Sequence, residues 1–377
     1  MEGSTAVFFS ALMFVVVFTV LVFVHEMGHY LVAKRNGVRV EVFSIGFGAT
    51  LYSWRDKSGT LWKISAVPLG GYVKFFGDAG VSSNPDAELS QLSPADKARS
   101  FHYKKLGQRA AIVAAGPLAN FLLAIVLLAG LFGTVGQPYI PAVVGTVEKG
   151  SAAEKAGFEP GDRILQVGDE EIERFEDLQR IVQDAPGVPL SIGIERNGRF
   201  MVLSATPKLS VQTDNFGHEQ KIGLLGISRS GVDYIRRGPI KAVWYAGKET
   251  VSIVRLTLRA VGQMVVGTRS AKELGGPLRI AEMSGRMAQE GIVTLIWFMG
   301  MLSINLGLIN LFPVPMLDGG HLLYYAFEAI RGKPLGERTQ EYGFRIGLAL
   351  VLALMVFVTW NDLNYLPVVD FFTGFFS

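Results

Sequence analysis

Long runs of apolar residues, uninterrupted by charge, are the dominant pattern along this chain. The longest lie at residues 3–24, 110–133 and 291–317, and a shorter one lies at 346–360 between Arg345 and Asp362. A helix needs about 20 apolar residues to cross the hydrocarbon core of a bilayer. The first three runs meet this length, and the fourth spans with tilt while Arg345 reaches back to the headgroups. The pattern therefore predicts about four transmembrane helices.

Lysine and arginine residues cluster at the ends of two of the connections between these runs. Cytoplasmic loops carry such an excess, so both connections are predicted to lie in the cytoplasm. The basic residues are Lys34, Arg35, Arg39, Lys104, Lys105 and Arg109 before the second run, and Arg331, Lys333, Arg338 and Arg345 before the fourth. Both termini and the large segment from about Pro138 to Glu290 then face the outer side.

In the segments between these runs, apolar residues recur at the spacings of strands and of an amphipathic helix. Residues 37–77 alternate apolar and polar positions, as at Val38, Val40 and Val42, which predicts strands that are apolar enough to dip into the bilayer. Residues 239–266 carry apolar side chains at helical spacing with charged residues between them. This spacing predicts an amphipathic helix, packed on its own domain or on the membrane face.

Composition narrows the classes of function. Of the 377 residues, 49% are hydrophobic and only 18% are charged, a balance that a single soluble domain rarely needs. The net charge is +3 and no Lys/Arg-rich block with interleaved aromatic residues occurs, so nucleic acid is not an expected partner. The chain has 0 cysteines, so a metal site must use His, Asp or Glu.

The sequence His25-Glu26-Met27-Gly28-His29 directly follows the first apolar run. Its two imidazoles stand four residues apart, so on a helix they share one face and can reach one zinc ion. Glu26 lies beside them and is the expected base, which takes a proton from water and passes it to the leaving amine. Ionisable groups at membrane depth cost about 3 kcal/mol or more unless they are paired, which favours a functional site over a polar helix end.

A catalytic zinc ion usually has three protein ligands, so the two histidines leave one to be found. The third run ends in a segment with Asn310, two prolines and Asp318-Gly319-Gly320-His321. Prolines unwind the helix and let Asp318 point inward at membrane depth, so Asp318 is the predicted third ligand. The alternative is that Asp318 caps the following helix. His321 is a rival ligand, whereas His102 and His218 are expected to be surface histidines.

Three separated motifs together resemble the site-2 proteases. They are His25 to His29 in the first span, Gly116-Pro-Leu-Ala-Asn120 in the second and Asn310 to Gly320 in the third. The likeness covers most of the chain and is greatest to bacterial members that cut an anti-sigma factor in regulated intramembrane proteolysis. It implies zinc held by His25, His29 and Asp318, with Glu26 as the base. It also implies a catalytic role for Asn310 and a substrate-side role for Asn120.

The same resemblance implies a re-entrant β segment. Gly70-Gly71-Tyr72-Val73-Lys74 matches the loop that presents the unwound substrate strand, so Gly70, Gly71 and Tyr72 are expected to bind substrate. The plain alternative is that these glycines only form turns.

Residues 150–165 resemble the PDZ signature, with Pro160-Gly161-Asp162 as a tight turn before a strand at 163–167. Residues 143–147 would then be the strand beside a groove for peptide ends. Many of the most similar site-2 proteases carry two tandem PDZ domains, whereas only one is found in this sequence.

The expected fold is a polytopic α-helical membrane protein with about four transmembrane helices, a membrane-associated β segment and an inserted PDZ domain of α+β type. The expected divisions are a first helix at 1–36, a cytoplasmic loop with the β segment at 37–108, a second helix at 109–136, the PDZ domain at 138–210, an outer amphipathic helical region at 211–290, a third helix at 291–330, and a cytoplasmic loop with the fourth helix at 331–377.

The expected function is zinc-dependent hydrolysis of peptide bonds in or near transmembrane segments of membrane-protein substrates. The resemblance implies a place in the bacterial inner membrane, with the PDZ domain on the outer, periplasmic side and the active site toward the cytoplasm. The alternatives are a metal-ion transporter and a non-catalytic PDZ membrane adaptor. The sequence shows no inverted repeat of the motif, as many transporters have, which argues against a transporter. A non-catalytic adaptor would have no use for Glu26, so the presence of Glu26 argues against an adaptor.

Overall fold

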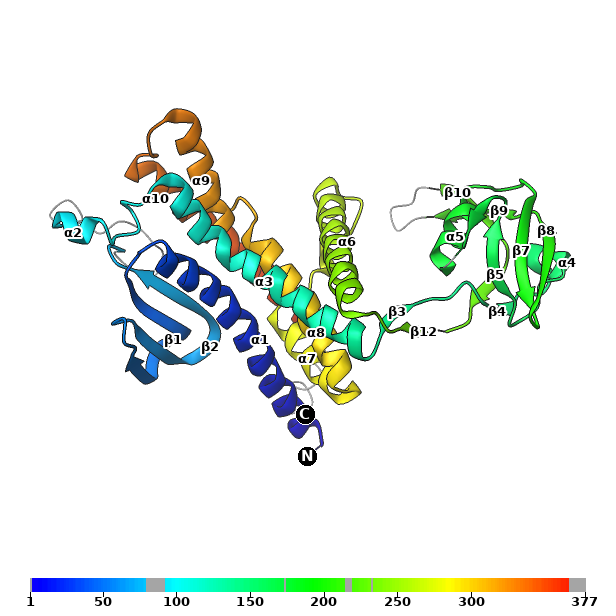
Figure 1. Cartoon of the computed structure of the whole chain (residues 1–377), viewed down its shortest axis with the longest axis horizontal. Coiled ribbons are helices and arrows are strands. Elements are labelled where there is room, and N and C mark those ends of the chain that lie inside the picture. The colour runs from blue at the N-terminus through cyan, green and yellow to red at the C-terminus, as the bar shows by residue number, and fades with distance from the viewer. Residues whose placement is uncertain (1, 79–91, 173, 214–218, 232, 366–377) are drawn as a thin grey trace. The chain divides into compact units, whose positions relative to one another are not determined.

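The computed structural model describes residues 2–78, 92–172, 174–213, 219–231 and 233–365 (Figure 1). The chain forms two compact units. The first comprises Met1–Gly130, Ala242–Val261 and Ser270–Ser377, and the second comprises Leu131–Lys241 and Gly262–Arg269.

Within the described residues, four helices are long and apolar enough to cross a membrane, as the sequence predicts. The candidate spans are Thr5–Arg35, Leu106–Thr134, Ile292–Asn310 and Arg338–Leu363. They belong to α1 (Glu2–Arg35), α3 (Leu106–Thr134), α8 (Ile292–Asn310) and α10 (Glu337–Tyr365). The third span ends at Asn310, earlier than the apolar run suggests, because Pro313 and Pro315 lack the N–H that a continuing helix needs. A separate helix, α9 (Asp318–Arg331), follows.

Small residues let the spans approach one another closely. A Cβ on Gly28 of α1 would lie 2.3 Å from the Ala115 carbonyl oxygen of α3, and one on Gly307 of α8 would lie 3.0 Å from the Pro117 oxygen. The Ser303 hydroxyl of α8 donates to the Asn120 carbonyl of α3 at 2.7 Å. Close backbone approach and polar contacts of this kind hold membrane helices together. Both α1 and α8 are thereby fixed against the same stretch of α3.

The predicted β segment consists of β1 (Val40–Arg55) and β2 (Leu61–Phe75), which pair antiparallel. Both strands bend, so residues 42–45 of β1 are registered with 61–64 as well as with 71–74 of β2. The bend in β1 falls at Gly46 and Gly48, whose φ angles of 87° and 85° suit glycine. One face packs with α1 and α3 through a core that includes Phe43, Val73 and Phe75. The short helix α2 (Pro94–Lys97) follows.

The second unit is built from short strands and two helices around its own hydrophobic core. A four-stranded sheet has the order β6 (Glu170–Glu171), β5 (Arg163–Val167), β7 (Leu190–Arg196) and β8 (Arg199–Ala205). The helices are α4 (Ala152–Ala156) and α5 (Phe175–Gln183). Three strand pairs join β4 (Val144–Val147) to β11 (Ile227–Arg229), β9 (Lys208–Thr213) to β10 (Glu219–Leu224), and β3 (Gln137–Tyr139) to β12 (Asp233–Ile235).

The second unit extends past the boundary at residue 210 that the sequence suggests. Ile227 of β11 is registered with Val147 of β4, and Leu225 belongs to the hydrophobic core. The helical part of the expected 211–290 region therefore begins only at α6 (Pro239–Val266), followed by a 3₁₀ turn (Ala271–Glu273) and α7 (Pro277–Glu290). Apolar residues in strands β10 and β11 alternate too briefly to stand out from a loop in the sequence.

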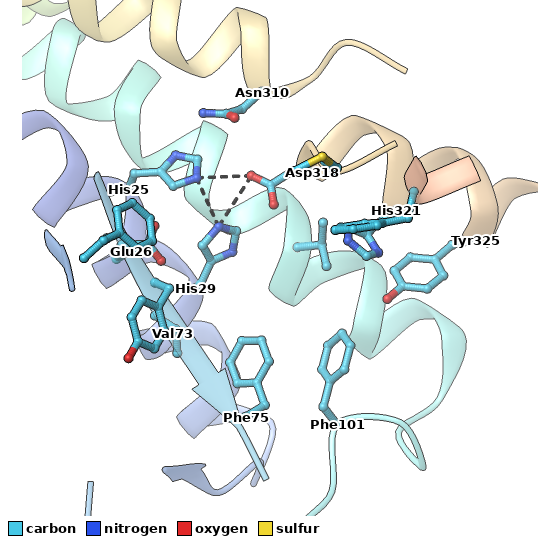
Figure 2. Close-up of a pocket in the computed structure, with 16 residues that line it drawn as sticks. His25, Glu26, His29, Val73, Phe75, Phe101, Asn310, Asp318, His321 and Tyr325 are labelled. Carbon is cyan, nitrogen blue, oxygen red and sulfur yellow. Dashed lines mark hydrogen bonds and ion pairs between the residues drawn. The ribbon is translucent and has the colours of Figure 1, made fainter. Parts of the chain in front are cut away.

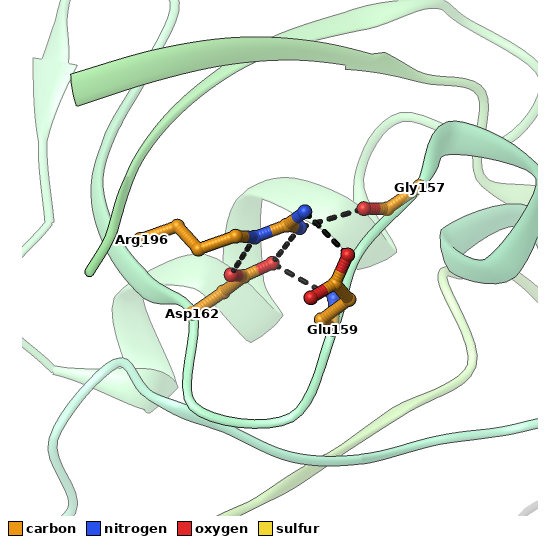
Figure 3. A network of polar contacts seen from close by, with 4 residues as sticks. All are labelled: Gly157, Glu159, Asp162 and Arg196. Carbon is orange, nitrogen blue, oxygen red and sulfur yellow. Dashed lines mark hydrogen bonds and ion pairs between the residues drawn. The ribbon is translucent and has the colours of Figure 1, made fainter. Parts of the chain in front are cut away.

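Arg196 secures the turn that carries the Pro160-Gly161-Asp162 sequence (Figure 3). Its guanidinium donates to both carboxylate oxygens of Asp162, at 2.6 and 2.7 Å, and to the Gly157 carbonyl at 2.7 Å. Burial acts to raise the pKa of Asp162, but the bonds from Arg196 and from the Glu159 N–H lower it below its usual value. The turn leads into β5 at Arg163, where the sequence predicts a strand.

Candidate metal and catalytic site

Three possible metal ligands converge where α1 meets the start of α9 (Figure 2). His25 Nε2 lies 3.2 Å from His29 Nε2 and 3.2 Å from Asp318 Oδ2, and His29 Nε2 lies 3.5 Å from the same oxygen. The histidines are one helical turn apart on α1, as their spacing predicts. Asp318 is the first residue of α9, and no side-chain bond caps that helix. The capping alternative for Asp318 is therefore not supported.

The three ligand atoms fit a zinc ion. Zinc–nitrogen bonds of about 2.0–2.1 Å at tetrahedral angles place neighbouring ligand atoms about 3.3–3.4 Å apart. The observed separations of 3.2 to 3.5 Å bracket this value. Asp318 Oδ2 is buried and has no hydrogen-bond partner within the described part of the chain. A buried carboxylate oxygen in that state calls for a cation.

Each histidine is oriented through its other ring nitrogen. His29 Nδ1 lies 2.9 Å from the Ile112 carbonyl, to which it donates, so its Nε2 lone pair faces Asp318. His25 Nδ1 lies 3.2 Å from the Asn120 side-chain amide. Among the described residues, Asn120 Oδ1 has no hydrogen-bond partner. Turning the amide by 180° lets this oxygen accept from Nδ1–H, which gives His25 the same tautomer as His29.

The convergent groups open into a cavity of about 400 Å³ (Figure 2). Glu26, Asn310, Gly71 and Tyr72 line it together with the three ligands. A Cβ on Gly71 would lie 3.1 Å from Glu26 Cγ, so the backbone of β2 lies directly against the expected base. One cavity thus holds the metal ligands, a carboxylate and the edge of a β-strand.

A family model described as "Peptidase family M50" matches residues 13–354. The chain belongs to this family. An Agrobacterium fabrum protein named "Putative zinc metalloprotease Atu1380" is 47% identical over 94% of this chain and 95% of its own length. A Brucella suis protein with the same type of name is 44% identical over 96% and 99% of the two chains, and "Metalloprotease MmpA" of Caulobacter vibrioides is 38% identical over 96% and 97%. This M50 protein is therefore a zinc metalloprotease of the site-2 type, embedded in a membrane.

A solved PDZ domain of an SdrC-like protein from Listeria monocytogenes aligns with 24% of this chain and 88% of its own, at 16% identity. The TM-score of 0.19 does not establish a shared fold. Of the three functions that the sequence leaves open, membership of the M50 family favours a protease over a metal-ion transporter or a non-catalytic adaptor.

Two of the expected substrate residues lie elsewhere. Asn120 is fully buried and contacts His25 rather than lining the cavity, because it sits on α3 behind that histidine. This position favours a role in orienting His25 over the predicted contact of Asn120 with substrate. Gly70 also lies outside the cavity lining, and its φ of 137° and its contact with the Phe47 ring explain the need for glycine there.

A cluster of polar residues that the sequence pattern does not predict lies beside the three metal ligands. His321 lines the catalytic cavity and also a second cavity of about 290 Å³, to which His102 and the Arg109–Glu328 ion pair belong. His102 Nε2 lies 2.9 Å from the buried carboxylate of Asp78, so the expectation of a surface histidine is wrong for His102. The two residues are 24 positions apart in the sequence, so no short-range periodicity could join them. His218 lies outside the described residues.

Proposed function

We propose that this protease hydrolyses peptide bonds in or near transmembrane segments of other membrane proteins, with zinc held by His25, His29 and Asp318. The observation that carries the proposal is the sharing of one cavity by the three ligand atoms, the Glu26 carboxylate and the edge of β2. Because α1 and α8 are membrane spans, a substrate segment reaches this cavity from within the bilayer.

The roles of the side chains follow from their positions. When bound, zinc supplies a Lewis acid that polarises water and the substrate carbonyl. The Glu26 carboxylate accepts the proton of the attacking water and delivers it to the leaving amine. Asn310 ends α8 at the rim of the cavity, where its amide can donate to the oxyanion that develops on the substrate.

The edge of β2 supports presentation of the substrate as a strand. A helix hides its own peptide bonds, so a transmembrane substrate must unwind before hydrolysis, and an unwound segment can pair with a free strand edge. Gly71, Tyr72 and Val73 all line the cavity beside Glu26. The substrate is therefore an extended stretch that continues the β1–β2 sheet.

The membrane orientation rests on charge. The basic residues around the β1–β2 segment favour its placement in the cytoplasm, which puts the active site toward the cytoplasmic side of an inner membrane and the second unit on the outer side. The second unit has a groove of about 350 Å³ between α5 and the segment from Gly223 to Ser228. A PDZ-type groove of this form would take an extended peptide, and its lining includes Thr146 of β4, within the strand predicted at 143–147, as well as Ile227 and Ser228 of β11.

The experiment is cleavage of a model transmembrane peptide by the full chain in lipid nanodiscs, with the variant Glu26→Gln beside the parent. The variant cannot accept a proton at neutral pH, so cleavage should fall by about 10²–10⁴-fold while bound zinc stays the same. Glu41→Gln is the matched control, because Glu41 pairs with Lys74 at 3.2 Å on the same sheet. Cleavage by Glu26→Gln at the parent rate would contradict the proposal.

A further inference from the structure

The last residue of β2 is closed to any further strand. The Phe75 N–H donates to Asp78 Oδ2 at 3.0 Å, and the Asp78 N–H donates to the Phe75 carbonyl at 3.1 Å. The next amide, that of Phe76, donates instead to the Arg39 carbonyl at 2.9 Å, on the side of β1. Asp78 thus satisfies both backbone groups that Phe75 turns away from β1.

The open part of the same edge lies nearer to the base. Backbone groups of successive strand residues alternate between the two sides, so Gly71 and Val73 point the same way as Phe75. In agreement, the Val73 backbone is hydrogen-bonded to the Glu26 carboxylate, and the Gly71 backbone lies against Glu26. Figure 2 shows Val73 and Phe75 on one strand beside His29. The edge is therefore closed at Phe75 by Asp78, whereas at Gly71 and Val73 it faces Glu26, and a substrate strand that bonds to Val73 takes the place of the Glu26 carboxylate there.

Asp78 is held firmly in this position. Its side chain has no exposed surface and lies 2.9 Å from His102 Nε2 through its other oxygen. The Phe75 ring stacks on Phe101, the residue before His102, at 5.0 Å between ring centres. A buried, hydrogen-bonded carboxylate that occupies the place of a neighbouring strand's carbonyl stops pairing at an edge.

Building on the proposed function, we propose that Asp78 is a positioning residue that ends the substrate-binding edge of β2. The substrate strand bonds to Gly71 and Val73 and not to Phe75. These residues span only about 7 Å, so roughly three substrate residues need to be extended. The site then accepts a transmembrane segment that unwinds briefly around the scissile bond and stays helical on either side.

Hydrogen exchange at single amides tests this directly. The full-length Glu26→Gln variant in nanodiscs is measured with and without a model transmembrane peptide. Binding should slow exchange at Gly71 and Val73, while Phe75 exchanges slowly in both states. In the double variant Glu26→Gln/Asp78→Ala, Phe75 should exchange at least about 10-fold faster without peptide and become protected when peptide binds. Fast exchange of Phe75 in the single variant, slowed by peptide, would overturn the proposal.

Kinetics of the active protein give the second measurement. Asp78→Ala opens one more residue to the substrate, so KM should fall by about 2- to 10-fold with kcat unchanged, the effect of one net hydrogen bond. A merely structural role would lower kcat or raise KM instead. His102→Ala, which releases the other Asp78 oxygen, should lower KM as well. This variant replaces Asp78→Ala in the measurement if Asp78→Ala does not fold. Glu41→Gln should leave both constants unchanged.

The two proposals fail differently. Absence of cleavage by the parent protein would count against the proposed function. Cleavage by the parent, with KM and Phe75 exchange unchanged in both the Asp78 and His102 variants, would count against Asp78 alone.

Discussion

Asn120 on the second span holds His25 on the first, with 3.2 Å between the side-chain amide and Nδ1. The amide is itself fixed, because the Asn120 backbone carbonyl accepts the Ser303 hydroxyl of the third span. All three spans therefore determine the direction of one metal ligand. A contact of this kind sets the tautomer and the orientation of a histidine that binds zinc.

Asn120→Ala should weaken zinc binding by about 10- to 100-fold, since it removes the partner of His25 Nδ1. Asn120→Asp should largely restore affinity, because a carboxylate oxygen accepts from Nδ1–H. Competition with a zinc-binding dye measures the zinc dissociation constant of the full-length protein in detergent, independently of catalysis. If Asn120→Ala binds zinc as tightly as the parent protein but has a raised KM, Asn120 contacts the substrate instead of orienting His25.

Asp318 and His321 lie on the same helix beside the same cavity, so they form a matched pair for the third-ligand assignment. Asp318→Ala should purify with little zinc, because two histidines alone leave the ion under-coordinated. His321→Ala should retain one zinc per chain. Metal analysis of the two variants separates the candidates, and the reverse outcome would make His321 the ligand.

The sequence was informative where one physical constraint dominates a continuous stretch. Apolar runs predict the four spans, and the four-residue spacing of His25 and His29 predicts their common face. The end of the third span needs more than hydropathy, because residues 311–317 are as apolar as the helix before them. Contacts between distant segments, such as His102 with Asp78, leave no periodic trace. They are decided by packing, which a single sequence does not display.

The ion pair between Arg196 and Asp162 predicts a pH dependence for the second unit. The folded state lowers the pKa of Asp162, so the stabilisation is present above the unfolded pKa of about 3.9 and is lost as pH falls through the folded value. Arg196→Met should destabilise this unit by about 2 kcal/mol at pH 7 and flatten its acid dependence. Exchange of the β5 and β7 amides in the full chain measures local unfolding.

Arg180→Met is the control for Arg196→Met. Arg180 pairs with Glu170, but both side chains are more than half exposed, and such pairs contribute little. Its effect on the same amides should be much smaller than that of Arg196→Met. Equal effects of the two substitutions would show that the Asp162 network does not stabilise the turn.

Gly116 keeps the space in which both zinc-binding histidines stand. A Cβ at this position would lie 2.2 Å from His29 Nε2 and 2.9 Å from His25 Cε1, so Gly116→Ala must displace the imidazoles from their positions beside Asp318. Alanine is otherwise favoured over glycine in a helix by about 1 kcal/mol, so the helix itself should not suffer. We expect loss of bound zinc and of cleavage without loss of the folded protein.

Gly130→Ala on the same helix α3 is the matched control, because nothing lies within 4 Å of a Cβ there. It should keep full zinc content and activity. Metal analysis and thermal unfolding of both variants decide the matter: a Gly116→Ala protein with parent zinc content would mean that the histidines do not occupy the arrangement on which the whole site depends.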